Sequence, residues 1–282
     1  MDETWYGFAI RTAPPGPPER PGSPGPDEPP EPPDSPRPPG PPGSSGPETP
    51  FGSRVVLTVD GDNAAAAALD EIRARYGGCD IDIWVDDRQR AERLHPVLLD
   101  AGCRASNDTI FLAHVGPVLV DRPAPPLAIS AVRADDNAEL RTWASVKLQG
   151  FADSDTPPDD AAVGREAEAW RAHAPISRYE VARWKGEPVA ILGVHEVEQD
   201  RGVFNLTTLP AFRHRGVAQE LLRRCVERAR AEGARSVSIN GDDGGAPVAL
   251  YRRMGFTDEI YWRRTYTWPG SLGLAGPPAV GG

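Results

Sequence analysis

The chain has 282 residues and a formal net charge of −10 at neutral pH. This length is enough for one or two domains with a packed core. The negative charge argues against a general nucleic-acid binder, which usually presents a basic face. No apolar run approaches the roughly 18–20 residues of a membrane helix, and the acidic start Met1-Asp2-Glu3 is unlike a secretory signal. We therefore expect a cytoplasmic protein with neither a nucleic-acid nor a membrane partner.

Cysteines and histidines are few and scattered. Cys79, Cys103 and Cys225 have no metal-ligand spacing, and the five histidines form no H-E-x-x-H or similar cluster. Cys225 falls on the apolar face of a predicted helix. We expect reduced cysteines that pack in the interior, and we expect no metal site.

Proline dominates the start of the chain. Eighteen of the first 50 residues are proline, and residues 14–50 contain almost nothing apolar to bury. Such a segment cannot offset its ordering entropy, so we predict a disordered tail over residues 1–50. A partner that binds its P-x-x-P spacings or the short aromatic patch at residues 5–10 is an open alternative to a simply solvated tail. Residues 269–282 are rich in glycine and proline and are predicted to be a second flexible tail.

Strand and helix patterns begin near residue 54 and are interrupted by prolines at 123–126. Strands are predicted where β-branched or aromatic residues cluster or alternate, and helices where apolar residues recur every three or four positions. The predicted strands are 55–59, 81–85, 109–115, 127–132, 178–184, 189–197, 202–208, 236–240 and 259–266. The predicted helices are 64–76, 88–101, 135–148, 161–173, 217–231 and 247–254. Mixed elements in this order give an α/β fold.

A tight turn joins strand 202–208 to helix 217–231 and contains Arg213-x-x-Gly216-x-Ala218. The small residues let another molecule approach the backbone closely. The free N–H groups and the dipole of a helix start favour a bound anion, at about 0.3–1 kcal/mol per contact. His214 and Arg215 add charge beside Arg213. The pattern indicates a pyrophosphate-binding turn; a plain turn with solvated arginines explains this passage alone equally well.

A second motif follows the next predicted strand, where Leu250-Tyr251 and Gly255-Phe256 form an L-Y-x-x-x-G-F signature. Arg213, Gly216 and Ala218 match the acyl-CoA motif Q/R-x-x-G-x-G/A. With both motifs in this order and spacing, the chain resembles the GNAT acetyltransferase family over residues 127–268. The resemblance implies a catalytic domain over 127–268 with the GNAT fold, a mixed and mostly antiparallel sheet flanked by helices.

The resemblance also implies a site for acetyl-CoA. The backbone of Leu206, Thr207 and Thr208 would bind the pantetheine arm like an added strand, and an N–H near Thr207 would polarise the thioester carbonyl. Tyr251 would protonate the departing thiolate as general acid, or would simply pack as a core tyrosine. With charge added by Arg213, the pyrophosphate would be held by the amides of His214, Arg215, Gly216, Val217, Ala218 and Gln219.

The sequence says less about the residues that would bind and deprotonate the amine acceptor. Some family members carry a glutamate on the strand before the turn, and here that strand offers Asn205. His195, Glu196 or a chain of water molecules could take the proton of the amine. Carboxylates of the loop 153–160 and of the helix that follows it could hold a cationic amine, or could face solvent. The loop 242–245 replaces an asparagine that is common in the family ahead of the tyrosine helix.

Residues 51–122 partly repeat the pattern of the C-terminal half. Aligning Gly102 with Gly255 puts Leu98 where Tyr251 stands. The turn 60–63 is acidic where the other turn is basic, and carboxylates would repel a pyrophosphate. We therefore predict a degenerate, inactive partial copy of the GNAT domain that packs against the catalytic one.

These patterns predict an N-acetyltransferase. The expected reaction moves an acetyl group from acetyl-CoA to a primary amine of a small molecule or peptide, by direct attack in a ternary complex. Two alternatives are kept: a non-catalytic acyl-CoA-binding or interaction protein, and a transferase that uses another acyl-CoA. A homodimer is compatible with the sequence but is not indicated by it.

Overall fold

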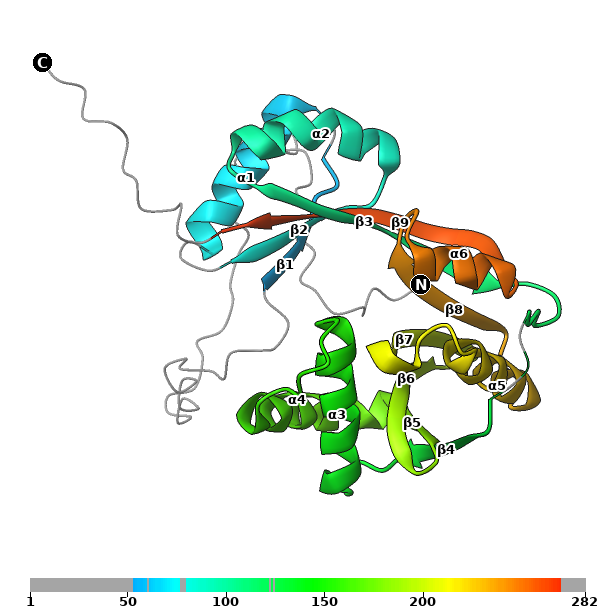
Figure 1. Ribbon diagram of the computed structural model, residues 1–282. Helices are drawn as coiled ribbons and strands as arrows, with labels where there is room; N and C mark the ends of the chain where they lie inside the picture. The colour runs from blue at the N-terminus through cyan, green and yellow to red at the C-terminus, as the bar shows by residue number, and fades with distance from the viewer. Residues whose placement is uncertain (1–52, 60, 77–79, 122, 124, 270–282) are drawn as a thin grey trace, which may run out of the picture.

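The computed structural model describes residues 53–59, 61–76, 80–121, 123 and 125–269. Except for Pro269, both predicted tails lie outside the described residues. The described chain forms one nine-stranded sheet in the order β1-β2-β9-β3-β8-β7-β6-β5-β4, with helices packed on it (Figure 1). The predicted α/β class and the mixed sheet flanked by helices are confirmed. None of the described helices is long and apolar enough to cross a membrane.

The strands and helices lie close to their predicted positions. The strands are β1 (Ser53–Val56), β2 (Ile81–Val85), β3 (Arg104–His114), β4 (Leu127–Val132), β5 (Ser177–Trp184), β6 (Glu187–Val197), β7 (Asp200–Thr208), β8 (Ser236–Asp242) and β9 (Phe256–Trp268). The helices are α1 (Asp62–Tyr76), α2 (Arg88–Asp100), α3 (Asn137–Phe151), α4 (Asp160–His173), α5 (Val217–Ala231) and α6 (Ala246–Arg253). The largest difference is in β3, which begins five residues before the predicted 109, because Arg104 and Ala105 pair with the far end of β9 across a bulge.

Helix α5 shows how local sequence sets an element that later positions the site. Its apolar residues are spaced so that Leu221, Leu222 and Cys225 are all fully buried. Gly233 ends the helix at φ 80°, a backbone conformation that glycine adopts without strain. The N–H of Ala234 then bonds back to the carbonyl of Ala229 at 2.8 Å, which satisfies one of the last helical carbonyls.

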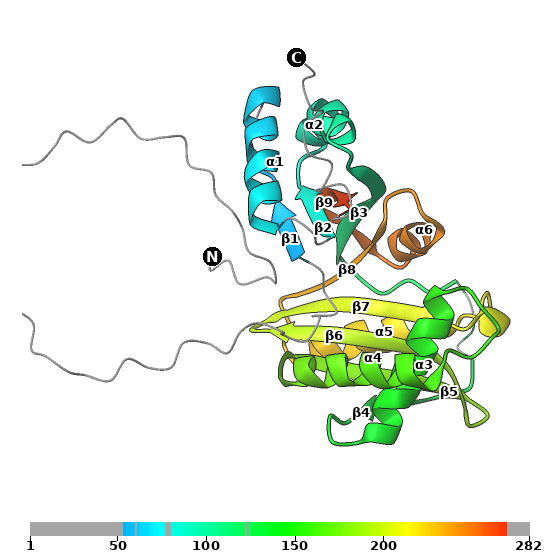
Figure 2. The ribbon, with the colours of Figure 1, turned by 90° about the vertical axis from the view of Figure 1, so that its left-hand side faces the viewer.

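The helices cover the two faces of the sheet unevenly. One hydrophobic cluster of the described residues gathers side chains from α1, α2, α5 and α6, and a second gathers side chains from α3 and α4. Neighbouring residues of β6 divide between the clusters, since Leu192 belongs to the first and Ile191 to the second, so the clusters lie on opposite faces. Figure 2 shows α3 and α4 in front of β6 and β7, with α5 behind them.

Counted outward from the β9–β3 pair, the next two strands have the same arrangement on both sides. On one side β9 is followed by β2 and β1, and on the other β3 is followed by β8 and β7. The senses also match, because β1–β2 and β7–β8 are parallel whereas β2–β9 and β3–β8 are antiparallel. The strands from residues 51–122 therefore extend the sheet, and β3 lies between the two C-terminal strands β8 and β9. The division into a partial copy and a catalytic domain at residue 127 stays a prediction.

Candidate active site

Strands β7 and β8 separate at their C-terminal ends. Their described pairing runs from Asp200 opposite Ser236 to Val203 opposite Ile239. Beyond these pairs β7 continues to Thr208 and β8 to Asp242 without pairing to each other. The backbone groups on the facing edges are thus left for another partner. An extended chain inserted between the two ends could bind as an added strand does.

A bulge in β7 marks the start of this opening. Ile191 pairs with Thr207 and Gly193 with Phe204, so β7 has one residue more than β6 between the two pairs. Asn205 takes up the extra length with φ 49°, an uncommon backbone conformation for a residue other than glycine. Bulges bend a strand and increase its twist, which accounts for the departure of Leu206–Thr208 from β8.

The turn after β7 leads straight into the N-terminus of α5. Two residues of the turn have left-handed backbone conformations, His214 at φ 60° and Gly216 at φ 80°. Gly216 is the N-cap residue, and no side chain caps the helix start. The amides of Val217, Ala218 and Gln219 therefore have no acceptor within the helix. This geometry and the helix dipole suit an anionic group, as the sequence pattern predicts.

Two buried oxygen atoms border the opening without a hydrogen-bond partner among the described residues. They are Oγ1 of Thr208, on a residue that is 8% exposed, and Oε1 of Gln219, on a residue that is 6% exposed. Buried polar atoms are nearly always paired in folded proteins. Their places, at the end of β7 and in the first turn of α5, fit hydrogen-bond donors such as the amide and hydroxyl groups of a pantetheine arm.

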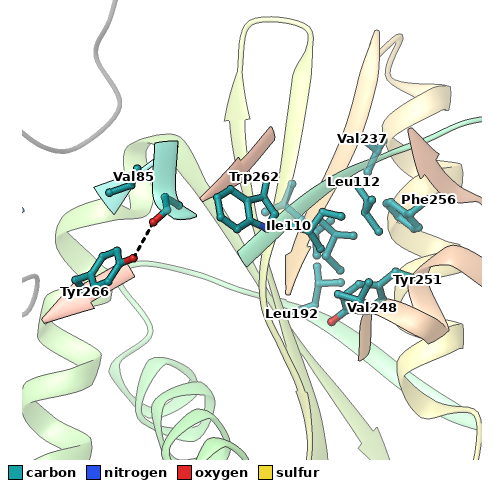
Figure 3. Close-up of a cluster of buried hydrophobic side chains, with 14 of the residues drawn as sticks. Val85, Ile110, Leu112, Leu192, Val237, Val248, Tyr251, Phe256, Trp262 and Tyr266 are labelled. Atoms are coloured by element: carbon teal, nitrogen blue, oxygen red, sulfur yellow. Dashed lines mark hydrogen bonds between the residues drawn. The ribbon is translucent and has the colours of Figure 1, made fainter. Parts of the chain in front are cut away.

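Tyr251 borders the opening from the side of β8. It lies on α6 next to Val248, and Figure 3 shows both side chains in the buried cluster near Phe256 of β9. Its ring packs on Gly241, near the unpaired end of β8. Burial, together with the nearby carboxylate of Asp242, raises the pKa of Tyr251 to about 12. The phenol is therefore protonated at neutral pH, as a proton donor must be.

The structure gives different surroundings to the three predicted basic residues of the turn. Arg213 donates hydrogen bonds to the carbonyl oxygens of Thr208 and Gly150 and forms an ion pair with Asp153. The guanidinium of Arg215 lies over the rings of Trp184 and Phe212, 5.5 Å from each centroid. His214 is exposed. The predicted backbone residues 206–208 and 214–219 thus meet around the opening, while the Arg213 side chain points toward α3.

The two residues considered as a base lie away from the opening. His195 pairs with Gly202, four residues along β6 from the Ile191–Thr207 pair, a distance of roughly 13 Å. Its Nδ1 lies 2.8 Å from the Ser177 hydroxyl. Burial, with a smaller contribution from the charge of His173, lowers the pKa of His195 to about 4. Glu196 forms an ion pair with Arg178 at 2.8 Å. Neither residue is positioned to take a proton beside Thr207.

Several carboxylates considered for the acceptor are engaged by neighbouring side chains or by a backbone amide. Asp159 caps α4 by accepting from the amide of Ala162. The other pairs are Asp153 with Arg213, Asp160 with Arg141, Glu166 with Lys147, and Glu168 with Arg171. In the described part of the chain, no group of three or more His, Cys, Asp or Glu side chains could hold a metal ion.

Two glycines of the site were not singled out from the sequence. Gly150 in α3 lies against the side chain of Thr207, and Gly241 of β8 lies against Tyr251. A glycine inside a helical or strand pattern can mark a close approach. The signal was absent at both positions, because the predicted helix ends at residue 148 and the predicted strand at residue 240, whereas α3 extends to Phe151 and β8 to Asp242.

Comparison with known proteins agrees with this geometry. The model of the family described as "Acetyltransferase (GNAT) family" matches residues 139–256, while the comparison with curated proteins gives no match. One similar solved structure is a functionally unknown conserved protein from Staphylococcus epidermidis ATCC 12228, with TM-score 0.56 and 12% identity, covering 76% of this chain and 83% of that one. Residues 139–256 therefore form a domain of the GNAT acetyltransferase family.

Two further solved structures share the fold. A tandem GNAT protein from the clavulanic acid biosynthesis pathway has TM-score 0.53 and 13% identity, covering 76% of this chain and 70% of that one. A GCN5-related N-acetyltransferase from Sphaerobacter thermophilus has TM-score 0.52 and 17% identity, covering 74% of this chain and 67% of that one. These likenesses extend over most of the described sheet and concern the fold alone.

Proposed function

We propose that the protein transfers an acetyl group from acetyl-CoA to a primary amine of a small molecule or peptide, within a ternary complex. The observation that carries the proposal is the opening between β7 and β8, with the uncapped start of α5 at one end. Membership of the GNAT acetyltransferase family in residues 139–256 supports transfer from an acyl-CoA in general. The acetyl group and the amine are the finer parts of the proposal.

Each part of the opening has a proposed task in binding the donor. The unpaired backbone of Leu206, Thr207 and Thr208 binds the pantetheine arm along β7. The amides of residues 214–219 hold the pyrophosphate, and the charges of His214 and Arg215 favour it. The orphaned oxygen atoms of Thr208 and Gln219 accept hydrogen bonds from the bound arm.

The chemical step needs few protein groups. The nitrogen lone pair of the neutral amine attacks the thioester carbonyl carbon, while a backbone N–H near Thr207 stabilises the developing negative charge on oxygen. The carbon–sulfur bond then breaks, and Tyr251 donates its phenolic proton to the leaving thiolate. The amine loses its proton to water, since His195 and Glu196 lie away from the opening. Holding both reactants together supplies several kcal/mol of the rate enhancement.

A second candidate function is binding of acyl-CoA without catalysis. The observation that favours it is that Asn205 stands on β7 where a base would be expected, and that the two candidate bases on β6 lie away from the opening. Such a protein would bind coenzyme A and would release no thiol with any amine.

A thiol-release assay with acetyl-CoA separates the two. The amine panel contains tyramine, spermidine, kanamycin and peptides with free N-termini, and the product is weighed by mass spectrometry. Thiol release that depends on one amine, with a product heavier by one acetyl group, supports the transferase. Coenzyme A binding without release across the panel supports the binding protein. Release with propionyl-CoA but not acetyl-CoA would identify a different donor.

A further inference from the structure

The guanidinium of Arg213 connects three separate segments around the opening. Its Nε donates to the carbonyl of Thr208 at 3.1 Å, and its Nη2 donates to the carbonyl of Gly150 at 2.9 Å. Its Nη1 pairs with the carboxylate of Asp153. One side chain thus ties the turn before α5 to the end of β7, to the last turn of α3 and to the loop after α3.

The last turn of α3 lies directly on the reactive end of β7. A Cβ on Gly150 would lie 2.5 Å from Oγ1 and 2.9 Å from Cγ2 of Thr207. Real Cβ atoms do not approach other atoms so closely, so a side chain at position 150 would push α3 off the strand. Thr207 is also the residue beside which the thioester carbonyl is expected.

Breaking the contacts of Arg213 would cost free energy, because its hydrogen-bond acceptors would be left without a donor. The carbonyl of Gly150 belongs to the final turn of α3, where carbonyl groups lack an intrahelical partner. The carbonyl of Thr208 is at the end of β7. If the guanidinium moved toward an anion at the start of α5, these two carbonyl oxygens would lose a charged hydrogen-bond donor. The protein contacts therefore compete with any contact to phosphate.

We propose that Arg213 is a positioning residue for the amine acceptor, not a ligand of the acyl donor. It holds the C-terminal turn of α3 and the start of the loop 152–159 against β7, so that this loop forms one wall of the acceptor site. The inference rests on the proposed function. It assigns the first residue of the motif to the acceptor side of the reaction and leaves the pyrophosphate to the backbone amides of α5.

The test compares variants of the full chain. Arg213→Gln removes the charge, Arg213→Lys keeps it but cannot make all the contacts, and Arg215→Gln is the control from the same turn. Coenzyme A affinity is measured by titration calorimetry. KM is measured for acetyl-CoA and for the amine with the highest turnover in the panel above. Backbone hydrogen exchange is followed over residues 148–156.

The expected result is a split between the two substrates. In Arg213→Gln the amine KM rises about tenfold or more, while the dissociation constant of coenzyme A changes by less than about threefold. Exchange over 148–156 becomes faster, and Arg213→Lys recovers part of each change. Arg215→Gln leaves the amine KM and the exchange over 148–156 unchanged.

A second variant tests the packing of α3 and its loop against β7 without substituting Arg213. Gly150→Ala is expected to raise the amine KM with little change in coenzyme A affinity. Its control is Gly164→Ala in α4, where a Cβ would meet only the end of the Arg141 side chain at 3.0 Å. If both Arg213→Gln and Gly150→Ala leave the amine KM unchanged, the positioning role is wrong.

The other outcomes are equally decisive. A tenfold weaker coenzyme A affinity in Arg213→Gln with an unchanged amine KM would make Arg213 a donor ligand and overturn the inference. If the unmodified chain neither binds coenzyme A nor releases thiol, the proposed function itself fails, and the inference fails with it. The unmodified chain thus reports on the function, and the variants report on Arg213.

Discussion

Gly241 and Tyr251 lie in direct contact across the gap between β8 and α6. A Cβ on Gly241 would lie 3.4 Å from Cε2 of Tyr251 and 2.9 Å from Cγ2 of Val248. The absent side chain lets α6 pack closely on the strand, with the Tyr251 ring beside the unpaired end of β8. The placement of the proposed proton donor therefore depends on a residue in another element.

Gly241→Val should displace Tyr251. Overpacking at this contact is expected to cost about 1–3 kcal/mol of folding free energy and to lower kcat at least tenfold, because a small misplacement of a catalytic group is enough to slow the reaction. The thiol-release assay gives kcat, and urea unfolding gives the stability. Unchanged kcat in a folded variant would show that the position of the ring does not matter.

Tyr251→Phe removes the phenolic oxygen and keeps the ring. If Tyr251 is the general acid, kcat falls by about 10²–10⁴-fold, the range of such catalysis, while the dissociation constant of coenzyme A changes little. Because burial and Asp242 raise the pKa of Tyr251 to about 12, its ionisation should not lower activity between pH 7 and 10. Full activity of the variant would leave Tyr251 as a core residue only.

Gly216→Leu should abolish coenzyme A binding. The side chain would fill the N-terminal approach to α5 and strain a backbone with φ 80°. Gly233→Leu is the matched control, because Gly233 has the same φ of 80° at the other end of α5. Both variants should lose similar stability in thermal unfolding, and calorimetry should show lost binding for Gly216→Leu alone. Equal binding losses in both would indicate a general effect on the helix.

His195 should make folding sensitive to acid. Its folded pKa, about 4, lies below the ordinary value near 6.5, so the unfolded chain binds the proton more readily. This contribution to stability is therefore complete above about pH 6.5 and is lost as the pH falls toward 4. Urea midpoints at pH 7.5 and 5 should differ less in His195→Gln than in the unmodified chain. His214→Asn, at an exposed position, serves as the control and should not alter the difference.

The C-terminal part should not fold alone. Strand β3 pairs with both β8 and β9, so a chain starting at residue 123 would leave two strand edges open in the middle of the sheet. That fragment is expected to be insoluble, and co-expression with residues 51–122 should restore a soluble complex. Calorimetry of the full chain should give one transition. A folded, monomeric fragment 123–282 would favour independent domains.

Much of the secondary structure around the opening could be predicted because its signals are local. Each motif lies within a short stretch of chain. One is identified by Gly216 and Ala218 at the start of a helix with an apolar face, and the other by Tyr251 four residues before Gly255. The helix α5 forms where its apolar spacing predicts it, and β2, β4 and α5 have the predicted bounds. Periodicity and backbone freedom act between neighbours in sequence, so they can be read without the fold.

The remaining features depend on residues far apart in the chain. The guanidinium of Arg213 meets Gly150, 63 residues away, and β3 enters the sheet between strands more than 100 residues later. The bulge at Asn205 depends on the pairing register of β7 with β6. The opening depends on where β7 and β8 stop pairing. By itself, the sequence determined the two motifs from which an acyl-CoA site is predicted. The tertiary structure decided which side chains face that site, because pairing register and helix packing bring distant segments together.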